Sequence, residues 1–163
     1  CMKNPDDYTA RANMMWASSL AHNGLTQCGR EFQLVVHQFE HELSGMYPKI
    51  AHGAGLAALW CSWARYVYKA NISRWLQYSA NVWNLDIDYE HPEKTIEEAI
   101  NLQEQYYVSL GMPIGLKALG VEEASLTKLA LNCSRNKTRT LTGYKPLAYD
   151  DILAIYQMAY ERG

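Results

Sequence analysis

The stretch HPEKTIEEAINLQEQYYVSLGMP, residues 91–113, predicts the class of fold because it carries the signals of a complete helix. Pro92 stands at the start, where the missing backbone N–H costs nothing, and Glu93 suits the positive end of the helix dipole. Gly111 and Pro113 follow at the end, where glycine often closes a helix and proline cannot continue one. We therefore predict a helix between Pro92 and Gly111.

The same spacing of apolar residues, three and four positions apart, recurs along almost the whole chain. No segment shows the strict alternation of a half-buried strand or the β-branched run of a fully buried one. We therefore predict an all-α fold of about seven helices. The other six are expected near residues 5–23, 31–46, 52–68, 71–83, 121–134 and 148–162.

The third of these helices carries AGLAALWCSWARYVY, residues 54–68, which is apolar on most sides. A helix of that kind is buried all round, so we expect it at the centre of the fold. Its longest apolar run ends at Arg65 and is too short for a membrane span of ~20 residues. We expect no membrane partner.

Length and composition suit one soluble globular domain over residues 1–163. The formal net charge of -2 argues against a nucleic-acid partner. The four cysteines are scattered and form no CxxC pair, which favours a reducing compartment and hence the cytoplasm. The chain begins CMKNPDDY, with a cysteine before the first methionine, so we expect it to be a piece of a longer polypeptide.

Three of the five histidines lie in HQFEHELSGMYPKIAH, residues 37–52. His37 and His41 are four apart on one helix, which places their Cβ atoms about 6 Å from each other on the same face. His52 follows the Pro48 turn, where an antiparallel return would bring it back toward them. Such a cluster can hold a metal ion, but histidines at this spacing also occur simply packed or at the surface.

The acidic residues of the same helix, Glu40 and Glu42, also have two readings. They suit a solvated face, or they accept hydrogen bonds from metal-bound histidines. A non-catalytic helical module is therefore an alternative, in which the histidines pack or bind a structural metal. A structural site is closed by four protein ligands, whereas a catalytic site keeps one position open.

These segments resemble a known family. HQFEHELSGMYPKIAHGAGLAALW followed by SWARYVY is similar to the signature of the iron-containing alcohol dehydrogenases, particularly their butanol-dehydrogenase-like branch. The likeness continues in RANMMWASSLAHNG, NVWNLD, SLGMP and TGYKPLAYDDILAIY, so it covers essentially the whole chain. The resemblance implies the helical carboxy-terminal domain of such an enzyme.

In that family an aspartate and three histidines hold one Fe²⁺ or Zn²⁺ ion. By resemblance His37 and His52 are two of these ligands. His41 is by resemblance not a ligand but a catalytic and cofactor-contacting residue beside the nicotinamide and the substrate. This implication overrules the helix-face pairing of His37 with His41.

The chain also departs from the family pattern. No aspartate is followed four positions later by histidine, so the other two family ligands are not found here, and the glycine-rich turn for the cofactor pyrophosphate is missing too. The resemblance therefore implies that the amino-terminal nucleotide-binding domain is absent from this chain. Cys61 stands where relatives more often have proline, for which we expect a local packing effect only.

The resemblance implies hydride transfer between a primary alcohol such as butanol, or its aldehyde, and NAD or NADP. The metal would polarise the alcohol oxygen, and His41 would contact the cofactor or relay the hydroxyl proton. The parent enzyme is expected to be a homo-oligomer, and the isolated chain to be inactive. A sister activity, such as glycerol dehydrogenase or dehydroquinate synthase, is the remaining alternative.

Overall fold

The computed structural model describes residues 1–29 and 31–162, and the chain divides into two compact units, Cys1–Gln33 and Leu34–Gly163. The first unit contains helix α1 (Tyr8–His22) and the short 3₁₀ helix η1 (Leu25–Gln27). Helix α1 begins at Tyr8, later than the predicted start near residue 5, because the Asp7 side chain caps it by accepting from the Ala10 N–H at 3.0 Å. None of its residues is buried.

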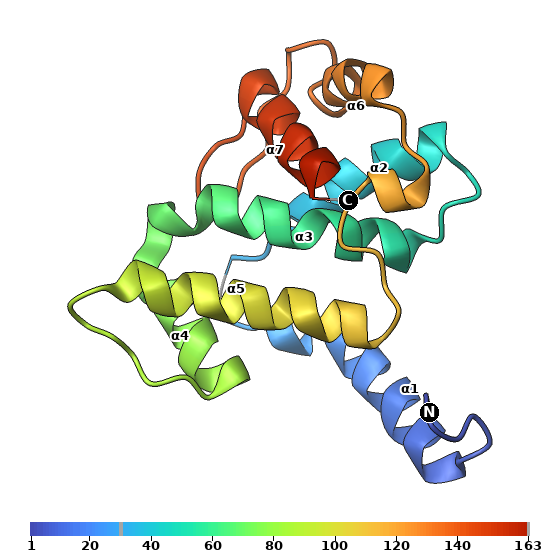
Figure 1. The fold of residues 1–163 in the computed structure, drawn as a ribbon, viewed down its shortest axis with the longest axis vertical. Coiled ribbons are helices and arrows are strands. Elements are labelled where there is room, and N and C mark those ends of the chain that lie inside the picture. Colours follow the sequence, from blue (N-terminus) through green and yellow to red (C-terminus); the bar gives the residue numbers. More distant parts are fainter. Residues whose placement is uncertain (30, 163) are drawn as a thin grey trace. The chain divides into compact units, whose positions relative to one another are not determined.

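The second unit holds the remaining helices (Figure 1). They are α2 (Val35–Met46), α3 (His52–Val67), η2 (Tyr68–Asn71), α4 (Ile72–Trp83), α5 (Pro92–Ser109), η3 (Lys117–Leu119), η4 (Glu123–Ser125), α6 (Leu126–Cys133) and α7 (Tyr149–Glu161). Within the described residues no strand forms, apart from an isolated antiparallel bridge between Leu141 and Leu147. The all-α prediction is confirmed.

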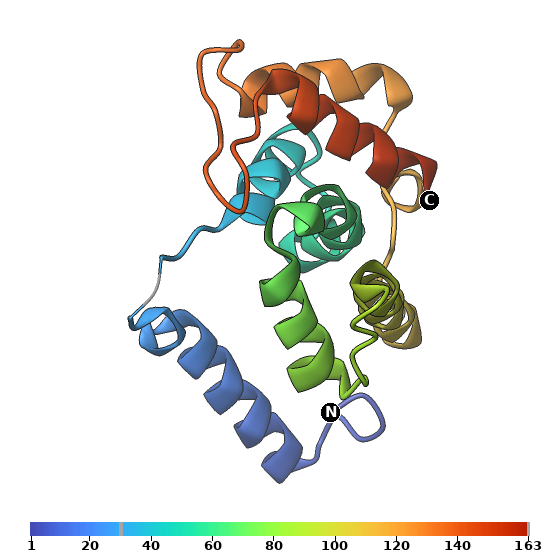
Figure 2. The same cartoon turned by 90° about the vertical axis from the view of Figure 1, so that its left-hand side faces the viewer.

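Helix α3 occupies the centre of this unit. It packs against α2, α5 and α7, with α7 on one side and α5 on the other in Figure 1, and Figure 2 views it almost end-on. Its buried residues are mostly small: Gly55, Ala57, Ala58, Leu59, Cys61, Ser62, Ala64 and Val67. Small side chains let neighbouring helices approach closely. The packing of α3 against three other helices confirms its predicted central place.

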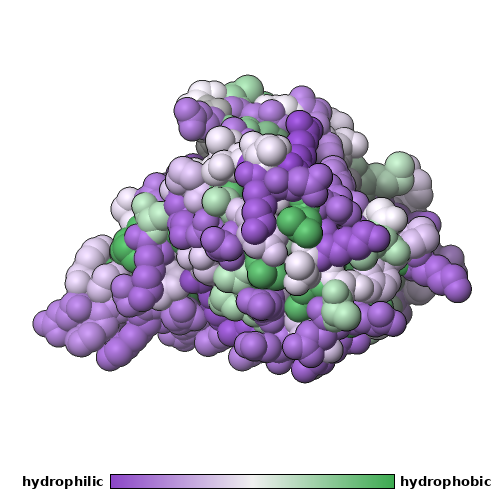
Figure 3. Space-filling model, turned by 90° about the horizontal axis from the view of Figure 1, so that it is seen from above, coloured by the Kyte–Doolittle hydropathy of each residue, from purple (hydrophilic) through white to green (hydrophobic). Residues whose placement is uncertain are grey.

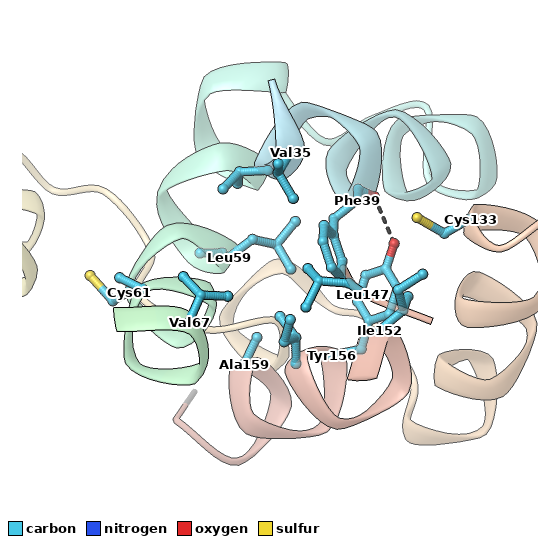
Figure 4. Close-up of a cluster of buried hydrophobic side chains, with 14 of the residues drawn as sticks. Val35, Phe39, Leu59, Cys61, Val67, Cys133, Leu147, Ile152, Tyr156 and Ala159 are labelled. Atoms are coloured by element: carbon cyan, nitrogen blue, oxygen red, sulfur yellow. Dashed lines mark hydrogen bonds between the residues drawn. The ribbon is translucent and has the colours of Figure 1, made fainter. Parts of the chain in front are cut away.

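The core between α2 and α7 is built around Phe39 and Tyr156, both fully buried (Figure 4). Their rings meet edge to face with centroids 5.2 Å apart, and the Tyr156 hydroxyl donates to the Phe39 carbonyl oxygen at 2.7 Å. Burial holds the pKa of Tyr156 well above its ordinary value, so this phenol remains a donor. Helix α2 is thereby fixed against α7.

Two helices of the second unit also begin later than predicted. Helix α2 starts at Val35 and not near residue 31, because residues 31–34 are exposed and gain nothing from helical packing. Helix α6 starts at Leu126 and not near 121, after Gly120 in a left-handed conformation and the short turn η4. The starts at His52 and Pro92 agree with the sequence signals.

The surface of the molecule shows few broad apolar areas on the face drawn in Figure 3, where polar side chains predominate and apolar ones are scattered. Among the described residues, no helix combines the length and apolar character that crossing a membrane requires.

Candidate metal centre

The three histidines of residues 37–52 come together between α2 and the start of α3. His37 and His41 lie one turn apart on α2, and their ring centroids are 6.0 Å apart. His52 is the first residue of α3, with its ring 5.2 Å from that of His37 and 5.6 Å from that of His41. The antiparallel return predicted after Pro48 therefore does bring His52 back to the histidines of α2.

A short anchored turn makes this return possible. Helix α2 ends at Met46, and the Ile50 N–H donates to the Tyr47 carbonyl oxygen at 3.0 Å within the turn. The Tyr47 hydroxyl then donates to the Ser125 Oγ at 2.7 Å, which ties the turn to η4. The backbone at the start of α3, and with it His52, is held from outside the helix pair.

Helix α2 is also held through its own carbonyl groups, between the two histidines. The Cys133 thiol donates to the Gln38 carbonyl oxygen at 3.5 Å, next to the Tyr156 contact with Phe39. Burial raises the pKa of the Cys133 thiol to about 12, so the thiol keeps the proton that it donates. Contacts from α6 and α7 thus fix the rotation of α2 that presents His37 and His41.

Behind the imidazoles lies one buried carboxylate. Glu40 is fully buried, and its Oε2 pairs with Nδ1 of His52. Its other oxygen, Oε1, accepts a hydrogen bond from the Ser44 hydroxyl. The His52 side chain is 47% exposed while that of Glu40 is inaccessible, so the ring lies at the surface and its acceptor behind it.

The solvated reading of Glu40 is therefore wrong, and the reading as an acceptor of a histidine hydrogen bond fits. A signal in the sequence could have found it: Glu40 follows Val36 by four positions and precedes Leu43 by three, which puts it on the buried face of α2. Glu42 is only partly buried and lies on a different face.

The donor atoms suit a divalent transition metal. One nitrogen each of His41 and His52 and a carboxylate oxygen of Glu40 lie within 4.8 Å of one another. Imidazole and carboxylate ligands accept both iron and zinc. The ring of His37 adjoins both other imidazoles, while the group of converging donor atoms consists of Glu40, His41 and His52.

Comparison with known proteins agrees with the family resemblance of the sequence. The sequence profile described as Fe-containing alcohol dehydrogenase family, C-terminal, matches residues 1–160. The NADH-dependent butanol dehydrogenase A of Clostridium acetobutylicum is 38% identical over 160 residues, covering 98% of this chain and 41% of that protein. The NADPH-dependent aldehyde reductase YqhD of Escherichia coli is 30% identical over 162 residues, covering 97% and 40%.

The fold agrees with these sequence matches. The crystal structure of NADH-dependent butanol dehydrogenase A from Thermotoga maritima superimposes with a TM-score of 0.89 at 30% identity, covering 97% of this chain and 41% of that one. The chain thus spans about two-fifths of the length of each of these relatives. It belongs to the iron-containing alcohol dehydrogenase family and corresponds to the carboxy-terminal helical domain of that family's proteins.

Proposed function

We propose that this chain is the metal-holding part of an NAD(P)-dependent alcohol dehydrogenase, or aldehyde reductase, that acts on primary alcohols such as butanol. The observation that carries the proposal is the meeting of three imidazoles, with centroids no more than 6.0 Å apart, on a chain of this family. The names of the relatives support both the substrate class and the nicotinamide cofactor.

In this proposal the histidines divide by role. His37 and His52 hold Fe²⁺ or Zn²⁺, and the ion when bound supplies a Lewis acid that polarises the substrate oxygen. His41 is exposed, one turn along α2 from His37, which suits contact with the nicotinamide and passage of the hydroxyl proton to solvent.

The rest of the enzyme would come from outside this chain. Because the relatives are much longer than the matched part, we propose an amino-terminal nucleotide-binding domain in the parent polypeptide, which supplies the remaining ligands and the cofactor site. Four free cysteines support a reducing, cytoplasmic setting. Exposed apolar side chains such as Trp16 and Val82 are compatible with a homo-oligomer.

The division of roles is tested in the full-length protein by three single substitutions. His37→Ala and His52→Ala should each lose the metal, since either change leaves the ion one bond short. His41→Ala should keep the metal and lose turnover by roughly a hundredfold or more if it relays the proton. His91→Ala, which removes a histidine near the start of α5 beside Asp88, is the matched control and should change neither.

Metal content by atomic emission, together with steady-state alcohol oxidation, separates these outcomes. A metal-free His41→Ala variant beside a metal-containing His37→Ala variant would replace the proposed ligands by Glu40, His41 and His52, the set whose donor atoms lie within 4.8 Å. Metal binding by that set without turnover would favour the structural metal module.

The isolated chain gives a second test. It should not reduce butanal with NADPH, because the proposed cofactor domain lies elsewhere, and it should bind Zn²⁺ only weakly. Turnover by the purified chain would show that the proposed second domain is unnecessary. Oxidation of glycerol in preference to butanol by the full-length protein would instead favour the sister activity.

A further inference from the structure

Glu40 stands apart from every other acidic or basic residue of the described chain, because it alone of them is fully buried. A buried carboxylate is costly unless its oxygens are paired. Both oxygens of Glu40 are paired, one with the Ser44 hydroxyl and one with Nδ1 of His52. The Glu40 carboxylate is therefore held in place by Ser44 on one oxygen and by His52 on the other.

The Glu40 side chain packs closely against Gly55. A Cβ atom at Gly55 would lie 2.8 Å from Cγ and 2.9 Å from Oε1 of Glu40, closer than side-chain carbons approach other atoms. Gly55 belongs to the first turn of α3, three residues after His52. The absence of a side chain at Gly55 thus makes room for the carboxylate between α2 and the start of α3.

The two ring nitrogens of a histidine are linked, since a neutral imidazole protonated at one nitrogen has its lone pair on the other. Ser44 donates to one oxygen of Glu40, and an ionised carboxylate has only acceptor oxygens, so Nδ1 of His52 would be the donor to the other oxygen. Nε2 of His52 then carries the lone pair, as a metal ligand requires.

We propose that Glu40 is a positioning residue that fixes His52 as the Nδ1–H tautomer and so presents Nε2 to the metal. The metal part of this inference rests on the proposed function, whereas the tautomer part stands on the contacts of Glu40 alone. Because both its oxygens are already engaged by protein groups, Glu40 acts through His52 and does not itself bind the ion.

The first measurement is nuclear magnetic resonance of the metal-free, ¹⁵N-labelled chain, which reports which nitrogen of His52 carries the proton. The native chain should show a protonated Nδ1. Glu40→Leu removes the acceptor and should shift His52 toward the Nε2–H form, whereas Glu40→Gln keeps an acceptor oxygen and should preserve the native form. Glu42→Gln, on the same helix, is the charge-matched control and should change nothing.

Gly55→Ala tests the same point without removing the carboxylate. The added Cβ displaces Glu40, so His52 should shift as in Glu40→Leu even if the leucine variant does not fold. Gly53→Ala, on the same helix, is the matched control, because a Cβ atom at Gly53 would meet no atom within 4 Å. An Nε2–H form in the native chain, or the native form in Gly55→Ala, would overturn the proposal.

The second measurement is the Zn²⁺ affinity of the full-length protein carrying the same substitutions, by isothermal titration calorimetry. Loss of a group that orients a metal ligand typically lowers affinity 10- to 100-fold, so we expect a drop of roughly this size in Glu40→Leu and Gly55→Ala. Glu40→Gln should lose less, and the two controls should match the native chain. A Glu40→Gln variant that loses Zn²⁺ entirely with an unchanged tautomer would make Glu40 a ligand and refute its positioning role.

The two proposals fail separately. A full-length enzyme without alcohol oxidation, whose His52 still responds to Gly55→Ala, would refute the dehydrogenase and leave the role of Glu40 intact. An active enzyme whose His52 tautomer is unchanged by both Glu40→Leu and Gly55→Ala would refute the role of Glu40 and leave the dehydrogenase intact.

Discussion

Helices α1 and α3 have almost the same length, 15 and 16 residues, yet they differ completely in how they are held. Helix α1 has no buried residue, and Trp16 is 66% exposed. Helix α3 has eight buried residues and forms the centre of its unit. Most helical stability in proteins comes from packing of an apolar face. The contrast indicates that α3 shares in the cooperative core of the second unit, whereas α1 buries no apolar face.

The largest expected effect comes from proline in each helix. Ala64→Pro places a ring at a fully buried position of α3 and removes a backbone hydrogen bond, which costs about 3 kcal/mol or more. Ala17→Pro, at an exposed position of α1, should remove only local helicity. Circular dichroism during heating should show no cooperative transition for the first variant and a nearly native midpoint for the second. Equal loss of the midpoint in both would place α1 in the core.

A cavity in each helix gives a smaller effect. Leu59→Ala empties a fully buried site and should lower the free energy of unfolding by about 2–5 kcal/mol. Met15→Ala, at a side chain that is 72% exposed, should change it by no more than about 0.5 kcal/mol. Urea denaturation followed by tryptophan fluorescence measures both values. A Met15 effect above 1.5 kcal/mol would contradict the contrast between the helices.

The four cysteines also differ in exposure between the two units. Cys1 and Cys28 are exposed in the first unit, whereas Cys61 and Cys133 are buried in the second. Burial raises the pKa of both buried thiols from 9.0 to about 12. We expect a disulfide reagent at neutral pH to label the exposed pair quickly and the buried pair only on unfolding. Rapid labelling of all four thiols would show that the core opens readily.

The same shifts predict how stability depends on pH. Because the folded state holds these two protons to a higher pH than the unfolded state, their stabilising contribution is complete below about pH 9 and is lost as the pH rises toward about 12. Urea denaturation at pH 8 and pH 10 should therefore show a falling free energy of unfolding. The fall should be smaller in Cys61→Ala, and an identical fall would assign the effect to other groups.

Helix caps give the smallest expected effect. Asp7 caps α1 and Asn71 caps α4, each accepting a backbone N–H through its side chain at 3.0 Å and 3.2 Å. Asn71→Ala should cost about 1 kcal/mol of the free energy of unfolding of the second unit. Asp7→Ala should leave that transition unchanged and reduce only helicity at low temperature. Urea titration monitored at two wavelengths distinguishes the lower free energy of unfolding expected for Asn71→Ala from the lower helicity expected for Asp7→Ala.

Local signals in the sequence predicted some parts of the fold well. The start of α5 at Pro92 and of α3 at His52 follow from residues at those positions, and the central place of α3 follows from its apolar composition. The later starts of α2 and α6 escaped prediction, because the ends of a helix depend on whether neighbouring elements cover them. The spacing of apolar residues within a segment does not show whether a neighbouring element covers the ends of the helix.

The candidate site was predictable to a similar extent. Spacing placed His37 beside His41, and the Pro48 turn indicated that His52 would return to them. The family resemblance, not the spacing, supplied the division of the three histidines into ligands and a catalytic residue, and that division stays a prediction. The pairing of Glu40 with His52 could not be derived from spacing, since it depends on the distance between two helices that Gly55 allows.

The contacts that hold α2 have a consequence for the order in which the chain assembles. The hydrogen bonds onto Gln38 and Phe39 span 95 positions from Cys133 and 117 positions from Tyr156. During synthesis from the amino terminus, α2 can therefore be fixed in place only after α7 has emerged. Contacts of such long sequence separation form slowly. We expect the capacity to bind metal to appear among the final events of folding, and a nascent chain released before residue 156 to lack it.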